Sequence, residues 1–92
     1  MGEVEGKPPH ARLTPREREM ACLAAQGLSL DEIAQMLYVA QTYVKRTLSQ
    51  RVYRKFEDAF FPEGRRVVNQ AMLAFLLRPY VDWVAQGRPR IQ

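Results

Sequence analysis

Apolar residues recur with the spacing of amphipathic helices along the first half of the chain. Ahead of the first apolar stretch, Thr14 and Glu17 have the spacing of a capping box, and Pro15 suits the first position of a helix. Gly27 supplies the left-handed residue that commonly follows a helix. The pattern therefore predicts a helix over about residues 15–26.

A second, shorter helix follows at once. Ser29 and Glu32 have the spacing of another capping box. The apolar residues behind them form one stripe: Leu30, Ile33, Ala34 and Leu37. Residues 38–40 must form the next connection, so this helix has room for about two turns. A helix this short is not stable alone in water, so we expect it to pack on its neighbours.

The third stretch predicts a longer helix over about residues 41–56 with two unlike faces. The inner positions are apolar and recur every four residues: Val44, Leu48, Val52 and Phe56. The outward positions are polar or cationic: Gln41, Thr42, Lys45, Arg46, Ser49 and Gln50. Such a face offers positive charge to phosphates and amide or hydroxyl groups to base edges. The pattern therefore favours nucleic-acid binding by this helix.

The last third of the chain is more apolar, and we expect a helix over about residues 66–78 that Pro79 ends or kinks. A short final segment follows, which Gly87 closes. Every residue from 71 to 77 is apolar, although a helix on the surface of a monomer needs only one apolar stripe. This predicts a homodimer that uses residues of this helix: Met72, Leu73, Leu76 and Leu77.

These elements predict one all-α domain of four to five helices over residues 13–92, with a C-terminal dimerisation helix and an extra tail. A chain of 92 residues has room for one domain. Residues 1–12 contain two glycines and two prolines and show no apolar periodicity, so we expect a flexible N-terminal arm.

The distribution of charge strengthens the nucleic-acid interpretation. The chain has 14 Lys and Arg against 10 Asp and Glu, a net charge of +4 that raises the expectation of an anionic partner. No acidic residue stands between Ile33 and Phe56, whereas five basic residues do: Lys45, Arg46, Arg51, Arg54 and Lys55. A solvated helix face can also carry such a run, so charge alone does not settle the function.

Other classes of function find little support. The chain has one His and one Cys and no clustered carboxylates, so we expect neither an enzyme nor a metal or other cofactor. Cys22 lies in an apolar stretch and is expected in the core. A single cysteine fits the reducing cytoplasm. The longest apolar run has seven residues, far short of the ~20 needed to cross a bilayer, so no membrane partner is expected.

Two helices joined by a tight turn, the second one cationic, form the pattern of a helix-turn-helix. The segment from Leu13 to Phe56 resembles the DNA-binding domain of the LuxR/GerE family, in a stand-alone, GerE-like form. The matching pieces lie in the right order at the right spacing: residues 13–19 (LTPRERE), 26–29 (QGLS), 32–34 (EIA), 44–45 (VK) and 53–55 (YRK).

The resemblance implies a bacterial transcription regulator with a four-helix, winged-helix-like domain that binds double-stranded DNA as a dimer. Its fourth helix would lie at the dimer interface. Lys45 matches the lysine of the family's Thr-Val-Lys motif, and Ser29 begins a helix whose free N–H groups can bind a phosphate. The full set of expected DNA contacts is Ser29, Gln41, Thr42, Tyr43, Lys45, Arg46, Ser49, Gln50 and Arg54.

The chain departs from the family pattern at several positions. Ala40 replaces the usual capping Ser or Thr, Tyr43 replaces the usual Thr, and Arg51 stands where an apolar residue is expected. The Tyr-Arg-Lys piece over residues 53–55 comes one residue late, which predicts that the C-terminal part of the third helix is rotated or extended.

An alternative from another class stays open. The Leu-Thr-Pro-Arg-Glu-Arg-Glu opening over residues 13–19 is also similar to region 4 of a sigma factor, which contacts both promoter and polymerase. On that interpretation the chain is an interaction module for RNA polymerase or another regulator, and the apolar tail is its partner surface.

Overall fold

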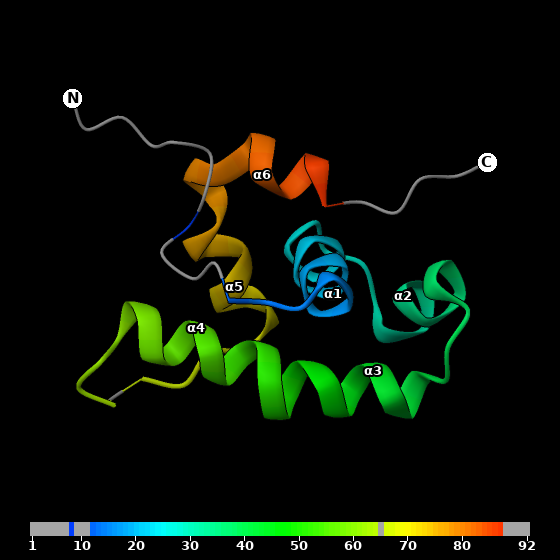
Figure 1. The fold of residues 1–92 in the computed structure, drawn as a ribbon, viewed down its shortest axis with the longest axis horizontal. Helices are drawn as coiled ribbons and strands as arrows, with labels where there is room; N and C mark the ends of the chain where they lie inside the picture. The colour runs from blue at the N-terminus through cyan, green and yellow to red at the C-terminus, as the bar shows by residue number, and fades with distance from the viewer. Residues whose placement is uncertain (1–7, 9–11, 65, 88–92) are drawn as a thin grey trace.

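The computed structural model describes residues 8, 12–64 and 66–87, which fold into helices without any strand (Figure 1). The all-α prediction is therefore confirmed. The elements in chain order are α1 (Pro15–Ala25), α2 (Leu30–Leu37), α3 (Gln41–Thr47), the π-helical η1 (Leu48–Val52), α4 (Tyr53–Phe60), α5 (Gln70–Leu76), the 3-10 helix η2 (Arg78–Tyr80) and α6 (Val81–Gln86). Apart from Pro8 and Arg12, the expected N-terminal arm over residues 1–12 lies outside the described residues.

Both predicted capping boxes are present, so α1 and α2 begin where the sequence places them. The Thr14 hydroxyl oxygen accepts the Glu17 N–H at 3.1 Å, and the Glu17 carboxylate accepts the Thr14 N–H at 3.1 Å. In α2 the Ser29 hydroxyl accepts the Glu32 N–H at 3.1 Å, and the Glu32 carboxylate accepts the Ser29 N–H at 2.8 Å. Each side-chain cap contributes about 1 kcal/mol to the stability of its helix.

The end of α1 is a Schellman motif. Gly27 takes the left-handed conformation with φ of 90°. The Leu28 N–H donates to the Leu23 carbonyl at 3.3 Å, and the Gly27 N–H donates to the Ala24 carbonyl at 3.0 Å. This pair of bonds satisfies carbonyl groups that would otherwise lack partners at the helix end.

α3, η1 and α4 follow one another without a break and form the longest helix of the described residues, along the lower edge of Figure 1. It runs on to Phe60, beyond the expected end near residue 56. A spacing of four residues overshoots one α-helical turn by about 40°, so its apolar stripe would drift around a regular helix. The wider turn of η1 offsets this drift. All four inner residues are buried: Val44, Leu48, Val52 and Phe56.

The helix expected over residues 66–78 is shorter than predicted, because α5 begins only at Gln70. Asn69 is extended, and its side chain accepts the Met72 N–H at 2.9 Å. Asn is among the strongest N-caps. Asn69 therefore fixes the start of this helix, although apolar residues precede it. The expected effect of Pro79 is confirmed, since the chain passes there through η2 into α6, which ends before Gly87.

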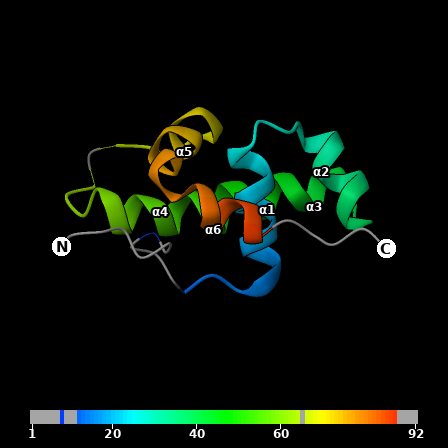
Figure 2. The same ribbon diagram turned by 90° about the horizontal axis from the view of Figure 1, so that it is seen from above.

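α1 is the central helix of the fold. It packs against α2, η1, α5 and α6, and the two views agree that α2 lies on one side of it and α5 on the other (Figure 1, Figure 2). Five consecutive residues, Met20–Ala24, are fully buried. Cys22 is therefore a core residue, as expected. In the part of the chain that the structure describes, no helix has both the length and the apolar character that a membrane span requires.

Candidate nucleic-acid interface

The turn between α2 and α3 has only three residues, 38–40, and the two helices pack against each other. Tyr38 takes the left-handed conformation with φ of 58° and ψ of 45°. The Val39 N–H donates to the Ala34 carbonyl at 3.1 Å, and the Tyr38 N–H donates to the Gln35 carbonyl at 3.4 Å. The turn is therefore a second Schellman motif, which joins α2 and α3 within three residues.

The start of α3 differs from the starts of α1 and α2. Ala40 is its N-cap residue, and its side chain makes no capping hydrogen bond. The N–H groups of Tyr43 and Val44 donate to the Ala40 carbonyl at 3.1 and 3.2 Å. Burial of Val44 and Thr47 against the rest of the fold, rather than a side-chain cap, therefore holds α3 in place.

The side chains expected to contact DNA from the long helix are all exposed: Gln41, Thr42, Tyr43, Lys45, Arg46, Ser49, Gln50 and Arg54. The other helices lie on one side of the long helix in Figure 1, so they leave its opposite side uncovered. The Ser49 hydroxyl donates to the Lys45 carbonyl at 2.8 Å, so its proton is engaged within the helix and its oxygen is left to accept.

The cations of this face are unpaired within the described part of the chain. Lys45, Arg46, Arg51 and Arg54 are exposed and form no ion pair with any described residue. A carboxylate beside them would compete with a phosphate, and the chain has none between Glu32 and Glu57. Without an ion-pair partner, these exposed cations are available to neutralise an external anion, although Arg51 also acts on Glu17 through its charge.

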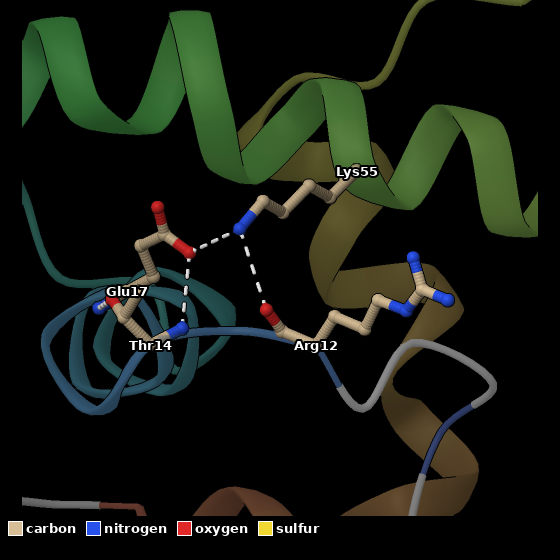
Figure 3. Close-up of polar contacts among 4 residues, drawn as sticks. All are labelled: Arg12, Thr14, Glu17 and Lys55. Carbon is tan, nitrogen blue, oxygen red and sulfur yellow. Dashed lines mark hydrogen bonds and ion pairs between the residues drawn. The ribbon is translucent and has the colours of Figure 1, made fainter.

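Lys55 belongs to the same basic run, but its ammonium group forms an ion pair within the fold. Its Nζ lies 2.6 Å from the Glu17 carboxylate and 3.4 Å from the Arg12 carbonyl oxygen (Figure 3). The ion pair joins α4 to the start of α1, across 38 positions of sequence. No local pattern marks such a pairing, so the sequence alone does not predict it.

The Glu17 carboxylate is almost fully buried, with 5% of its side chain exposed. Burial acts to raise its pKa, but the Lys55 hydrogen bond, the Thr14 N–H and the charges of Lys55 and Arg51 outweigh that effect. The pKa of Glu17 is therefore held below its ordinary value of 4.5. At neutral pH the ionised carboxylate both caps α1 and binds α4.

Ser29 stands apart from the other expected DNA contacts. It is exposed but lies at the far end of α2 from the turn, about 12 Å along the helix axis. Its backbone N–H and hydroxyl oxygen are both engaged with Glu32. Asp31 and Glu32 place negative charge beside it, so this helix start is a less favourable phosphate site than the long helix.

The expected dimer surface requires a correction. Leu73 and Leu77 are buried in the core of the single chain, and Met72 and Leu76 are half-buried. A run that is apolar on every side does not show which side faces the core, and packing against α1 decides it. The large exposed apolar side chains in this region are instead Phe75 on α5 (62% exposed) and Val81 on α6 (68% exposed).

An apolar groove of about 260 Å³ lies beside these residues, where α1, α5 and α6 meet. Its lining combines small and aliphatic side chains with one amide: Ala25, Gln26, Ala74, Leu77, Val81, Val84 and Ala85. Such a groove fits an apolar side chain better than a charged ligand.

A cluster around Trp83 fixes α6 on α1. The Trp83 carbonyl accepts from the Cys22 thiol at 3.8 Å and from the Arg18 guanidinium at 3.5 Å. The Arg18 guanidinium also lies over the Trp83 ring, 4.9 Å from its centroid. Burial raises the pKa of the Cys22 thiol to about 11, so the thiol is protonated and unreactive. Among the described residues, no group of His, Cys, Asp or Glu is placed to hold a metal ion.

No protein-family model matches this chain, and no curated protein or solved structure matches it either. Any functional assignment therefore rests on the residues, their surroundings and the resemblance of the sequence motifs.

Proposed function

We propose that this chain is a sequence-specific, double-stranded DNA-binding transcription regulator of the LuxR/GerE type. The observation that carries the proposal is the exposed face of α3 and η1, which is cationic and polar, has no carboxylate, and belongs to a helix-turn-helix. The B-DNA major groove is wide enough to admit an α-helix, and α3 is the helix that would enter it.

The side chains on this face suit both parts of DNA recognition. Lys45 and Arg46 supply charge for phosphates or bidentate contacts to guanine, and Gln41 and Gln50 supply amides that match adenine. Arg54 lies farther along the helix, in α4, and would contact the phosphate backbone. We propose no catalytic role and no cofactor for this chain, and we place it in the cytoplasm of a bacterium.

A symmetric homodimer completes the proposal. Phe75 and Val81, together with the half-buried Met72 and Leu76, form the apolar surface that a second copy would cover. A two-fold axis there would present two recognition helices to half-sites about one DNA turn apart, which favours an inverted-repeat site.

The test compares substitutions on and off the cationic face. Lys45→Ala and Arg46→Ala should each weaken binding to a duplex recovered by in vitro selection by roughly 1–3 kcal/mol, without changing thermal stability. With about four phosphate contacts per subunit, the wild-type dimer should show a slope of log affinity against log salt near −7. Arg78→Ala is the matched control, because Arg78 is an exposed arginine on η2, away from α3. Wild-type affinity in the Lys45 and Arg46 double variant would remove the proposal.

The apolar groove beside Val81 favours a second candidate, a module that binds RNA polymerase or another regulator. On that view, binding to purified polymerase would depend on Val81 and Ala74, and affinity for DNA would be weak and nearly independent of salt. A pull-down with a Val81→Glu variant beside the DNA titration separates the two functions.

A further inference from the structure

The residue at the left-handed position of the turn between α2 and α3 is one that this backbone does not favour. Tyr38 has φ of 58°, and a left-handed residue with a Cβ crowds the following carbonyl oxygen. A bulky residue in this region is uncommon, and glycine is the usual choice at the end of a helix.

α1 provides an internal comparison. Its Schellman motif has the same pair of hydrogen bonds, and Gly27 stands at the left-handed position. The fold therefore obtains this turn from glycine at one site and from tyrosine at the other. No packing offsets the backbone cost of Tyr38, because its side chain is 94% exposed. Its hydroxyl also has no hydrogen-bond partner among the described residues.

The position of Tyr38 points to its partner. It precedes Ala40, the N-cap of α3, by two residues, so its Cα lies within about 7 Å of the start of the recognition helix. The N-terminal residues of a recognition helix contact base edges while the helix before it crosses the DNA backbone. The turn that joins the two helices would therefore lie near the phosphates. Tyrosine is among the side chains that bind DNA phosphates.

We propose that Tyr38 is a further DNA contact, outside the recognition helix, with its hydroxyl donating a hydrogen bond to a backbone phosphate beside the groove that α3 enters. The inference rests on the proposed function. It assigns a DNA contact to a turn that has no positive charge, at the cost of fold stability.

The experiment measures stability and affinity of the full-length chain together, using the selected duplex as probe. Tyr38→Gly relieves the left-handed strain, so its thermal midpoint should rise by roughly 2–6 °C while its affinity for the duplex falls roughly 3- to 10-fold. Tyr38→Phe keeps the ring and the backbone cost, so its midpoint should stay unchanged while affinity falls by a similar factor. Neither variant loses a cation, so the salt slope should stay at the wild-type value.

Gly27→Tyr is the reciprocal control. A Cβ at this position meets no atom within 4 Å, so the substitution causes no clash at the Cβ, and the left-handed φ makes it unfavourable. This variant should lower the thermal midpoint and leave affinity unchanged, which shows that an exposed tyrosine in the same motif does not bind DNA by itself.

The outcomes separate this inference from the function beneath it. If Lys45→Ala weakens binding but both Tyr38 variants bind like wild type, the Tyr38 contact is overturned and the proposed function stands. If only Tyr38→Gly weakens binding, the hydroxyl–phosphate bond is overturned. If Tyr38→Gly lowers the midpoint, the side chain supports the fold and the premise of the inference is overturned. If no variant on this surface changes affinity, the proposed function fails and the inference fails with it.

Discussion

The ion pair between Glu17 and Lys55 allows a prediction about stability and its pH dependence. Replacing Lys55 with Met keeps the aliphatic stem and removes the ammonium group, which leaves the buried Glu17 carboxylate without its cation. Breaking a fully buried pair costs about 3–5 kcal/mol, and a hydrogen bond to a charged group contributes about 1.5–3 kcal/mol. Lys55 is 32% exposed, so water screens part of the interaction, and we expect a loss of about 2 kcal/mol at pH 7.

The sign of the pH dependence follows from the pKa of Glu17. The folded wild type holds this pKa below 4.5, so the ion pair's contribution is present above that pH and is lost as pH falls through the lowered pKa. In Lys55→Met the largest cause that lowers the pKa of Glu17 is gone, and burial still acts to raise the pKa of this carboxyl. Acid then protonates Glu17 at a smaller cost to the variant than to the wild type. The difference in stability between the two proteins should therefore shrink as pH falls from neutral towards 4.

Urea unfolding followed by circular dichroism at several pH values measures this difference. Glu17→Gln is the companion variant, because glutamine preserves the capping box while it removes the charge. The double variant should lose less stability than the sum of the two single losses, since each single change breaks the same pair. A Lys55→Met protein as stable as wild type at pH 7, or a difference that does not vary with pH, would refute the reasoning.

Two further predictions concern α6 and assembly. A Cβ at Gly87 would overlap the Cys22 thiol, so Gly87→Ala should cost about 1–3 kcal/mol and shift Trp83 fluorescence to the red, and Cys22→Ala should restore both. A Gly87→Ala protein with wild-type stability and emission would contradict this packing. Phe75→Glu with Val81→Glu should give a folded monomer by light scattering that binds the selected duplex weakly, because both side chains are exposed in the single chain. A wild-type protein that stays monomeric at high concentration and on DNA would end the dimer proposal.

The features that the sequence predicted well depend on neighbouring residues. The Thr14 and Ser29 capping boxes are local, and they placed the starts of α1 and α2 correctly. The four-residue spacing from Val44 to Phe56 identified the inner face of the long helix. The exposure of the outer face follows from that inner face, which is why the candidate contacts on α3 and η1 could be named in advance.

The features that were missed depend on packing between distant segments. The run over residues 71–77 is apolar on all sides, so only the contact with α1 shows that Leu73 faces inward and Phe75 outward. The apolar pattern predicts too early a start for α5, since it extends upstream of Asn69, the residue that caps this helix. Lys55 looked like part of a cationic surface because its partner, Glu17, is far away in the chain.

The π-helical segment η1 sets the rotational phase between the two halves of the long helix. The first half presents its polar residues outward, and the second half holds Phe56 in the core and Lys55 against α1. If the same residues wound as a regular α-helix, the extra residue would turn everything beyond η1 by about 100° relative to the first half. The wider turn of η1 therefore fixes the orientation of the side chains that we propose contact DNA relative to those that anchor the helix on α1.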